Sequence, residues 1–185
     1  MTQPPWLRDP GINLYLQELV TWGGRMNLVG STQDNALRRH LEECLAAAPE
    51  LPRGARVVDL GSGAGLPGLP LQIRRRDLQV TLVESRARRV HFLRHVAREL
   101  SLECVILHGR IEELQPRPHD YALLRAVAPL ERSLELARPW VCSGGEIWVW
   151  TRETLSGPAH AGEIPLGSRG RILRVHVADV SRGTL

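Results

Sequence analysis

A glycine-rich turn between two short apolar runs constrains this 185-residue chain most strongly. Residues 57–68 read Val-Val-Asp-Leu-Gly-Ser-Gly-Ala-Gly-Leu-Pro-Gly, and Glu84 follows the next apolar run at 80–83. A buried strand, a glycine turn at the start of a helix and an acid about 20 residues later are typical of open α/β domains that hold a nucleoside-containing cofactor. We therefore expect an α/β fold with its ligand at this turn.

The glycine pattern narrows the kind of ligand. A phosphate-binding P-loop requires a lysine, and all 24 basic residues of this chain are arginine. Residues 63–68 match the dinucleotide pattern G-x-G-x-x-G, which is weak evidence by itself. The longer string Asp59-x-Gly61-x-Gly63-x-Gly65 resembles the first motif of class I S-adenosylmethionine-dependent methyltransferases.

That motif assigns a role to each residue type. Glycines let the backbone approach the amino-acid part and the sugar of the cofactor. Asp59 can meet the cofactor's ammonium group, directly or through water, and Glu84 can accept hydrogen bonds from both ribose hydroxyls. The alternative is a tight strand–helix turn without a ligand. Strand, turn, helix and distal acid together favour a bound cofactor, and the resemblance implies that it is S-adenosyl-L-methionine.

Composition limits the remaining classes. Hydrophobic residues make up 43% and charged residues 24%, as in ordinary globular proteins, and no apolar run reaches the roughly 20 residues of a membrane span. The first residues lack a signal-peptide pattern, so we expect a cytoplasmic protein without membrane contact. Three widely spaced cysteines suggest neither disulfides nor zinc, and no metal is expected. The net charge of +4 is compatible with an anionic partner.

Periodicity predicts a single domain over 1–185, with a helical cap at 1–50 and an α/β core at 55–185. The cap contains helices at 9–26, which Asp9 can cap and Gly23-Gly24 should end, and at 35–48. Alternation of strands and helices predicts a mostly parallel sheet covered on both faces. The expected core elements are strands 55–60, 79–84, 103–108, 120–125, 145–151 and 171–180, helices 66–75, 86–100 and 129–138, and a loop at 153–168.

Several longer segments resemble one methyltransferase family over roughly residues 20 to 150. They are Gly-Ser-Gly-Ala-Gly-Leu-Pro-Gly-Leu-Pro at 61–70, Leu-Val-Glu-Ser at 82–85, Arg-Val-x-Phe-Leu-Arg at 89–94, Gly-Arg-Ile-Glu-Glu at 109–113 and Arg-Ala-Val-Ala at 125–128. Together they resemble the bacterial RsmG/GidB family, which methylates N7 of a guanine in 16S rRNA. The resemblance implies a Rossmann-like class I methyltransferase fold.

The resemblance also implies which residues line the cofactor site: Gly61, Leu66, Glu84, Ile111, Glu112 and Arg125. All follow predicted strands at their carboxyl ends, where open α/β sheets bind ligands. Arg125 is the expected positioning residue for catalysis, with a structural ion pair as the alternative. Glu112 could instead be the solvated start of a helix.

Methylation at guanine N7 needs no general base, because that nitrogen has a free lone pair and no proton to lose. The chain also lacks the Asn/Asp-Pro-Pro-Tyr segment of exocyclic amine methylation. We expect a monomer that acts on 16S rRNA or the small ribosomal subunit. A different RNA, a small-molecule acceptor, or a non-catalytic module that binds S-adenosylmethionine and RNA stay open as alternatives.

RNA contacts are expected from Arg38, Arg39, His40 and Arg152, because backbone phosphates attract clustered positive charge. His40 could equally be a helix contact. The five tryptophans are expected to pack in the core or at its edges rather than stack on bases.

Departures from the family pattern lie on the substrate side. The family has Ser where this chain has Leu124, Thr at Val29, Asp-Ser at Glu43-Cys44 and Lys-Gly at Thr151-Arg152. These departures leave the predicted cofactor site intact. They concern the residues expected to determine which acceptor is methylated.

Overall fold

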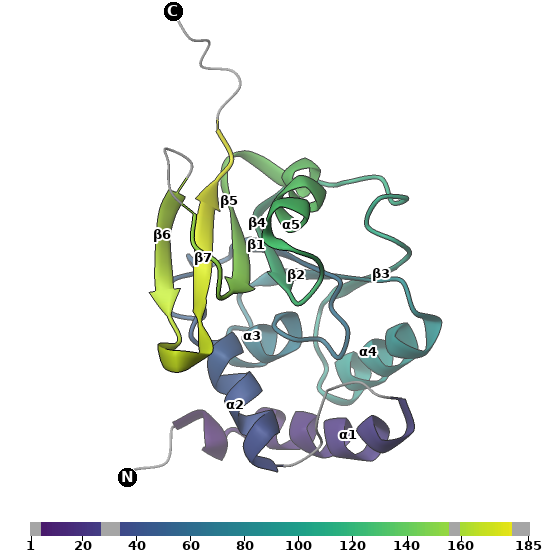
Figure 1. Cartoon of the computed structure of the whole chain (residues 1–185). Coiled ribbons are helices and arrows are strands. Elements are labelled where there is room, and N and C mark those ends of the chain that lie inside the picture. The colour runs from purple at the N-terminus through teal and green to yellow at the C-terminus, as the bar shows by residue number, and fades with distance from the viewer. Residues whose placement is uncertain (1–4, 27–33, 156–159, 179–185) are drawn as a thin grey trace, which may run out of the picture.

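The apolar runs of the chain form a seven-stranded sheet, in a computed structural model that describes residues 5–26, 34–155 and 160–178. The strand order is β3-β2-β1-β4-β5-β7-β6. Strands β1 to β5 run parallel, and β7 lies antiparallel between β5 and β6 (Figure 1). The predicted mostly parallel sheet is therefore confirmed. The strands are β1 (Arg56–Leu60), β2 (Gln79–Glu84), β3 (Val105–His108), β4 (His119–Arg125), β5 (Val141–Thr151), β6 (His160–Pro165) and β7 (Arg171–His176).

Helices cover both faces of the sheet unequally. Four helices lie on one face and α5 lies on the other (Figure 1). Successive side chains of a strand point to opposite faces, so Val57 joins the core beneath the four helices and Val58 joins the core beneath α5. The helices are α1 (Pro10–Met26), α2 (Asp34–Leu45), α3 (Gly68–Arg74), α4 (Ala87–Glu99) and α5 (Leu130–Ala137).

The two N-terminal helices form the predicted cap, and they are tied to the core. Asp9 caps α1, because its Oδ1 accepts a hydrogen bond from the N–H of Gly11 at 2.8 Å. Its Oδ2 accepts a hydrogen bond from Arg74 of α3 at 2.7 Å. Further along α1, Glu18 Oε2 lies 2.8 Å from Nε2 of His95 on α4. Polar contacts thus hold α1 against both α3 and α4.

Several sequence predictions were wrong in detail. Residues 153–168 are not all loop, since β6 occupies His160–Pro165 as an edge strand beside β7. Gly23-Gly24 does not end the first helix, which continues to Met26. Strand β5 begins at Val141 rather than residue 145, and β7 ends at His176. Tertiary packing overrides local propensity at each of these points.

The fold places a crevice at the carboxyl ends of the strands. From β1 the chain builds outward to β2 and β3, and then returns to add β4 on the other side of β1. Such a reversal leaves room between the loops that follow the two neighbouring strands. The loops at 61–67, 109–118 and 126–129 meet at this edge. In the described ranges no helix combines the length and the apolar character needed to cross a bilayer.

Candidate functional site

The glycine turn after β1 is held by the end of β2. The N–H groups of Gly61 and Ser62 both donate to the carbonyl oxygen of Val83, at 2.9 Å each. Gly61, Gly63 and Gly65 have φ angles of +74°, +59° and +90°, which residues with a side chain rarely adopt. The sequence needs glycine here because of this backbone path.

The glycines differ in what surrounds them. A Cβ on Gly65 would overlap Leu69 Cδ1, and one on Gly61 would lie 2.9 Å from Val127 Cγ2. A Cβ on Gly63 would meet nothing closer than Arg89 at 3.6 Å. Gly65 therefore serves close packing of the turn on its helix, whereas the space in front of Gly63 is free for a ligand.

Asp59 lies behind the turn. Its side chain is 1% exposed, and Oδ2 accepts the N–H of Gly68 at 2.9 Å. Oδ1 is buried without a hydrogen-bond partner in the described structure. Burial raises the pKa of this carboxyl to about 7, against the opposing effect of the Gly68 N–H. Asp59 thus supports the turn from beneath and is not part of the described lining of the two cavities at this edge.

Glu84 joins the turn to the start of α4. Its Oε2 accepts the N–H of Gly63 at 2.8 Å, and its Oε1 accepts the N–H of Arg86 at 2.7 Å. The guanidinium of Arg89 lies 3.8 Å from Oε2. A carboxylate has about four acceptor positions, so Glu84 retains capacity for hydroxyl donors.

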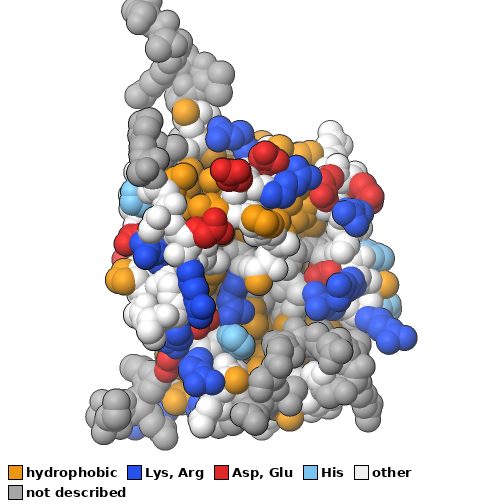
Figure 2. Space-filling model, viewed as in Figure 1, with side chains coloured by type: hydrophobic (Ala, Val, Ile, Leu, Met, Phe, Trp, Pro, Cys, Tyr) orange, Lys and Arg blue, Asp and Glu red, His pale blue; other side chains and the backbone are white. Residues whose placement is uncertain are grey.

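Two cavities meet at Gly61. The main cavity, of about 660 Å³, lies between the glycine turn, α2 and the β6–β7 connection. A smaller cavity of about 300 Å³ lies between the ends of β2 and β3 and the start of α5. Figure 2 shows this face hollowed near its centre, with basic side chains on both sides of the hollow. The main cavity is lined by Gly61–Ala64, Leu66, Arg89, Arg125, Ala126, Trp150–Arg152, Leu166, Arg169, Arg171, His40 and Glu43.

Arg125 combines the two alternatives that the sequence left open. It lines the main cavity, and its NH2 donates to Glu43 Oε2 at 2.8 Å and lies 2.6 Å from Nδ1 of His40. Burial and the guanidinium lower the pKa of His40, so a neutral ring accepts this hydrogen bond. Arg169 also lies 3.7 Å from Glu43. Helix α2 therefore fixes Arg125 at the edge of the cavity.

The smaller cavity contains the other predicted cofactor residues. Ile111 and Glu112 line it, together with Gly61. Ile111 packs against the core beneath α5, while the exposed Glu112 lies 3.4 Å from a guanidinium nitrogen of Arg132. An apolar floor beside polar groups suits a planar heterocycle.

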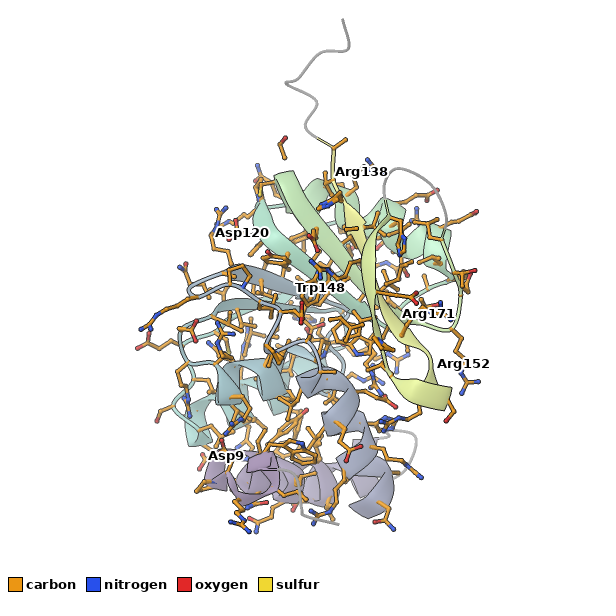
Figure 3. The ribbon with its side chains drawn as sticks, turned by 90° about the vertical axis from the view of Figure 1, so that its left-hand side faces the viewer. Asp9, Asp120, Arg138, Trp148, Arg152 and Arg171 are labelled. Carbon is orange, nitrogen blue, oxygen red and sulfur yellow. The ribbon has the colours of Figure 1, made fainter. Side chains whose placement is uncertain are left out.

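The structure separates the four predicted RNA contacts. His40 and Arg152 line the main cavity, Arg39 is exposed on α2, and Arg38 borders a different hollow between α1 and α2. Figure 3 shows Arg152 and Arg171 near each other, across the molecule from Asp120. Val29 and the neighbouring Asn27-Leu28 lie outside the described residues. Leu124 is fully buried, so its departure from the family pattern faces the core.

Some site residues were missed by sequence reasoning. Tyr15 of α1 is fully buried and donates from its hydroxyl to the carbonyl of Ala64 in the turn, at 2.7 Å. Ala126 has a φ of +57°, uncommon for a residue with a side chain. Trp140 and Trp148 are core residues as predicted, but Trp150 lines the main cavity. Arg169 and Arg171, which lie close together in the sequence, also line this cavity.

The arrangement suits a nucleoside-containing cofactor and an anionic partner. A glycine turn backed by Glu84 borders the main cavity, and five arginines line this cavity: Arg89, Arg125, Arg152, Arg169 and Arg171. Across the described ranges, no group of three or more His, Cys, Asp or Glu side chains could hold a metal ion.

Comparison with known proteins concerns the sequence as a whole. The family model for rRNA small subunit methyltransferase G (GidB) matches residues 9–156. The ribosomal RNA small subunit methyltransferase G of Mycobacterium leprae (strain TN) is 40% identical over 171 residues, covering 88% of this chain and 70% of the relative.

Solved structures agree on the fold. Coclaurine N-methyltransferase bound to N-methylheliamine and SAH superposes with a TM-score of 0.57 at 18% identity, over 78% of this chain and 46% of that one. TYW2 of M. jannaschii in complex with AdoMet superposes with a TM-score of 0.56 at 17% identity, over 65% and 53%. The predicted class I methyltransferase fold is confirmed.

Proposed function

Since the chain belongs to the rRNA small subunit methyltransferase G family, we propose that it transfers a methyl group from S-adenosylmethionine to N7 of a guanine in 16S rRNA. The observation that carries the proposal is the pair of cavities that meet at Gly61. One offers an apolar floor for a base, and the other is rich in arginine. A nucleoside cofactor and a nucleic acid would meet there.

The residues present fit the cofactor. Ile111 and Glu112 would hold the adenine, Glu84 would accept hydrogen bonds from the ribose, and the turn from Gly61 to Leu66 would hold the amino-acid part. Gly63 supports this assignment, because a Cβ there would overlap no protein atom and would occupy ligand space. When bound, S-adenosylmethionine supplies an electrophilic methyl group on a sulfonium.

The chain's own residues have to align the acceptor and stabilise the charge that it gains. Guanine N7 has no proton to remove, so no side chain is required as a base. Glu43 offsets the charge of Arg125 and Arg169, and His40 is neutral, so the cavity is less repulsive to a methylated, cationic base than its arginines suggest. Arg125 is then a positioning residue held by α2.

We infer further that the protein acts as a monomer in the cytoplasm. The arginines at the main cavity, including Arg152, would attract the phosphates of the small-subunit RNA.

The test incubates the protein with labelled S-adenosylmethionine and small ribosomal subunits that lack the modification, with free 16S rRNA in parallel. We expect label in 7-methylguanine, identified by mass spectrometry of the nucleosides, and clearly less label with Glu84→Ala when the cofactor is not saturating. Tight cofactor binding in calorimetry without label in either substrate would contradict the rRNA assignment. Label in another RNA or in a small molecule would move the function to that acceptor.

A further inference from the structure

Trp150 is a large aromatic side chain that lines the main cavity and has no assigned role in holding the cofactor. It is the next-to-last residue of β5, partly buried, and one side of the indole packs on the core beneath the four helices. In the sheet it pairs with Arg125 of β4 and Ile172 of β7. Trp150 and Arg125 are therefore direct neighbours on adjacent strands.

A hydrogen bond fixes the orientation of this ring. Nε1–H of Trp150 donates to the carbonyl oxygen of Glu43 on α2, at 2.9 Å. The carboxylate of the same Glu43 holds Arg125. The indole thus has its one polar atom satisfied by the helix that also positions Arg125, and its remaining surface at the cavity is apolar.

Two arginines extend the cavity beyond this ring. Arg152 follows Trp150 by two positions, and Arg171 lies beside Thr151 on β7. Arg171 is held by Glu163, while Arg152 is exposed (Figure 3). An anchored aromatic ring next to one exposed and one partly buried guanidinium group has the chemistry that recognises an unstacked base with its flanking phosphates.

We propose that Trp150 stacks on the acceptor guanine and that Arg152 and Arg171 bind phosphates next to it. This inference rests on the proposed function, because it assigns the acceptor side of the same site. The guanine has to leave its own stack to reach the cavity, and the indole face replaces part of the stacking that it loses. Trp150 is then a substrate-contacting, specificity-determining residue.

The test compares Trp150→Leu with Trp150→Phe. Both substitutions remove the N–H donated to Glu43, but only phenylalanine keeps an aromatic face. At saturating cofactor, Trp150→Leu should raise KM for small subunits roughly 5- to 100-fold, and Trp150→Phe should recover most of that loss. The cofactor dissociation constant should stay within about twofold of wild type in both variants, since the assigned cofactor residues are unchanged.

Trp22→Leu is the matched control. Trp22 is also partly buried and hydrogen-bonded, to Glu18, but it lies on α1 beside Phe92, away from the described lining of the main cavity. KM for small subunits should be unchanged in this variant. An equal rise in KM for Trp22→Leu and Trp150→Leu would point to general destabilisation and overturn the proposal.

A binding experiment separates this inference from the proposed function. With S-adenosylhomocysteine present, a short single-stranded RNA with one guanine is compared with the same RNA carrying an abasic site there. Wild type and Trp150→Phe should prefer the guanine, and Trp150→Leu should lose the preference. Equal behaviour of the Phe and Leu variants, or no preference in wild type, would overturn stacking. Absence of methyl transfer with the preference intact would instead contradict the proposed reaction.

Discussion

The two ends of the sheet carry cavities of nearly equal size and different character. The main cavity at the carboxyl edge measures about 660 Å³, and a second cavity at the amino edge measures about 670 Å³. Buried atoms without a hydrogen-bond partner do not distinguish them, since Arg171 of the main cavity has such an Nε and Gln72 of the amino-edge cavity has such an Oε1. Size and unsatisfied polar atoms therefore do not identify the site.

Charge and backbone conformation do separate the two cavities. The main cavity is lined by five arginines and one glutamate, and the amino-edge cavity by three arginines and two carboxylates. At the amino edge, Arg56 pairs with Asp120, and Arg76 donates to the carbonyls of Leu100 and Ser101. The carboxyl edge instead presents a glycine turn whose shape is maintained from three sides, by Val83, Glu84 and Tyr15. A backbone turn held in one conformation and an excess of positive charge therefore distinguish the carboxyl edge from the amino edge.

The largest effects are expected from substitutions of the glycines in the turn. Gly65→Ala places a methyl group against Leu69 at a φ of +90°, so the free energy of unfolding should fall by about 2–5 kcal/mol. Gly63→Ala meets no such overlap and should cost about 1–2 kcal/mol, yet should greatly weaken cofactor binding because its methyl group enters ligand space. Thermal unfolding and calorimetry measure the two effects. If the Gly63→Ala variant binds the cofactor with unchanged affinity, the cofactor does not bind in the main cavity.

The next effect concerns the acid that holds the turn. Glu84→Ala leaves the N–H groups of Gly63 and Arg86 without their acceptor and removes the predicted ribose contact. Cofactor binding should weaken by about 1–3 kcal/mol in calorimetry. Glu84→Gln, which keeps the shape and one acceptor oxygen, should fall between wild type and Glu84→Ala. Equal affinities for wild type and Glu84→Ala would mean that Glu84 shapes only the empty turn.

A smaller effect should come from the cap. Burial raises the pKa of Tyr15 well above its usual value, so its hydroxyl stays protonated and donates to Ala64. Tyr15→Phe should lower the free energy of unfolding by about 1 kcal/mol and raise the cofactor dissociation constant roughly fivefold. The matched control is Tyr121→Phe, which removes the hydroxyl of a partly buried tyrosine packed against Trp148. If both variants bind the cofactor equally well, α1 does not support the turn.

The sequence predicted the elements that rest on local pattern. The strand, glycine turn and helix around Gly61 were readable because buried parallel strands give continuous apolar runs and tight turns require glycine. Strand β6 could not be predicted from the sequence, because this edge strand contains Gly162 and Pro165 and has neither alternating polar and apolar residues nor an apolar run. The resemblance added the cofactor residues, which no local pattern could assign to a particular ligand.

What the sequence could not provide is the pairing of distant residues. Arg125 meets Glu43 across 82 positions, and Tyr15 meets Ala64 across 49. These contacts depend on how α1 and α2 pack over the strand ends, which periodicity does not specify. In the structure Arg125 both forms an ion pair with Glu43 and lines the main cavity. The sequence alone could not show that the two roles are compatible.

The smallest expected effects compare one arginine from each end of the sheet. Arg152→Ala removes an exposed charge at the main cavity, and Arg117→Ala removes one at the amino-edge cavity. If Arg152 contacts a phosphate, its loss should reduce the slope of log affinity against log salt concentration for 16S rRNA by about 1 and weaken binding to every sequence similarly. Arg117→Ala should leave slope and affinity unchanged, because RNA held at the carboxyl edge does not reach the opposite end. Filter binding at several salt concentrations measures both, with cofactor affinity as the check that each variant keeps its site. Equal slope changes would mean that the RNA covers both ends of the sheet, and the difference in charge would then no longer mark the functional edge.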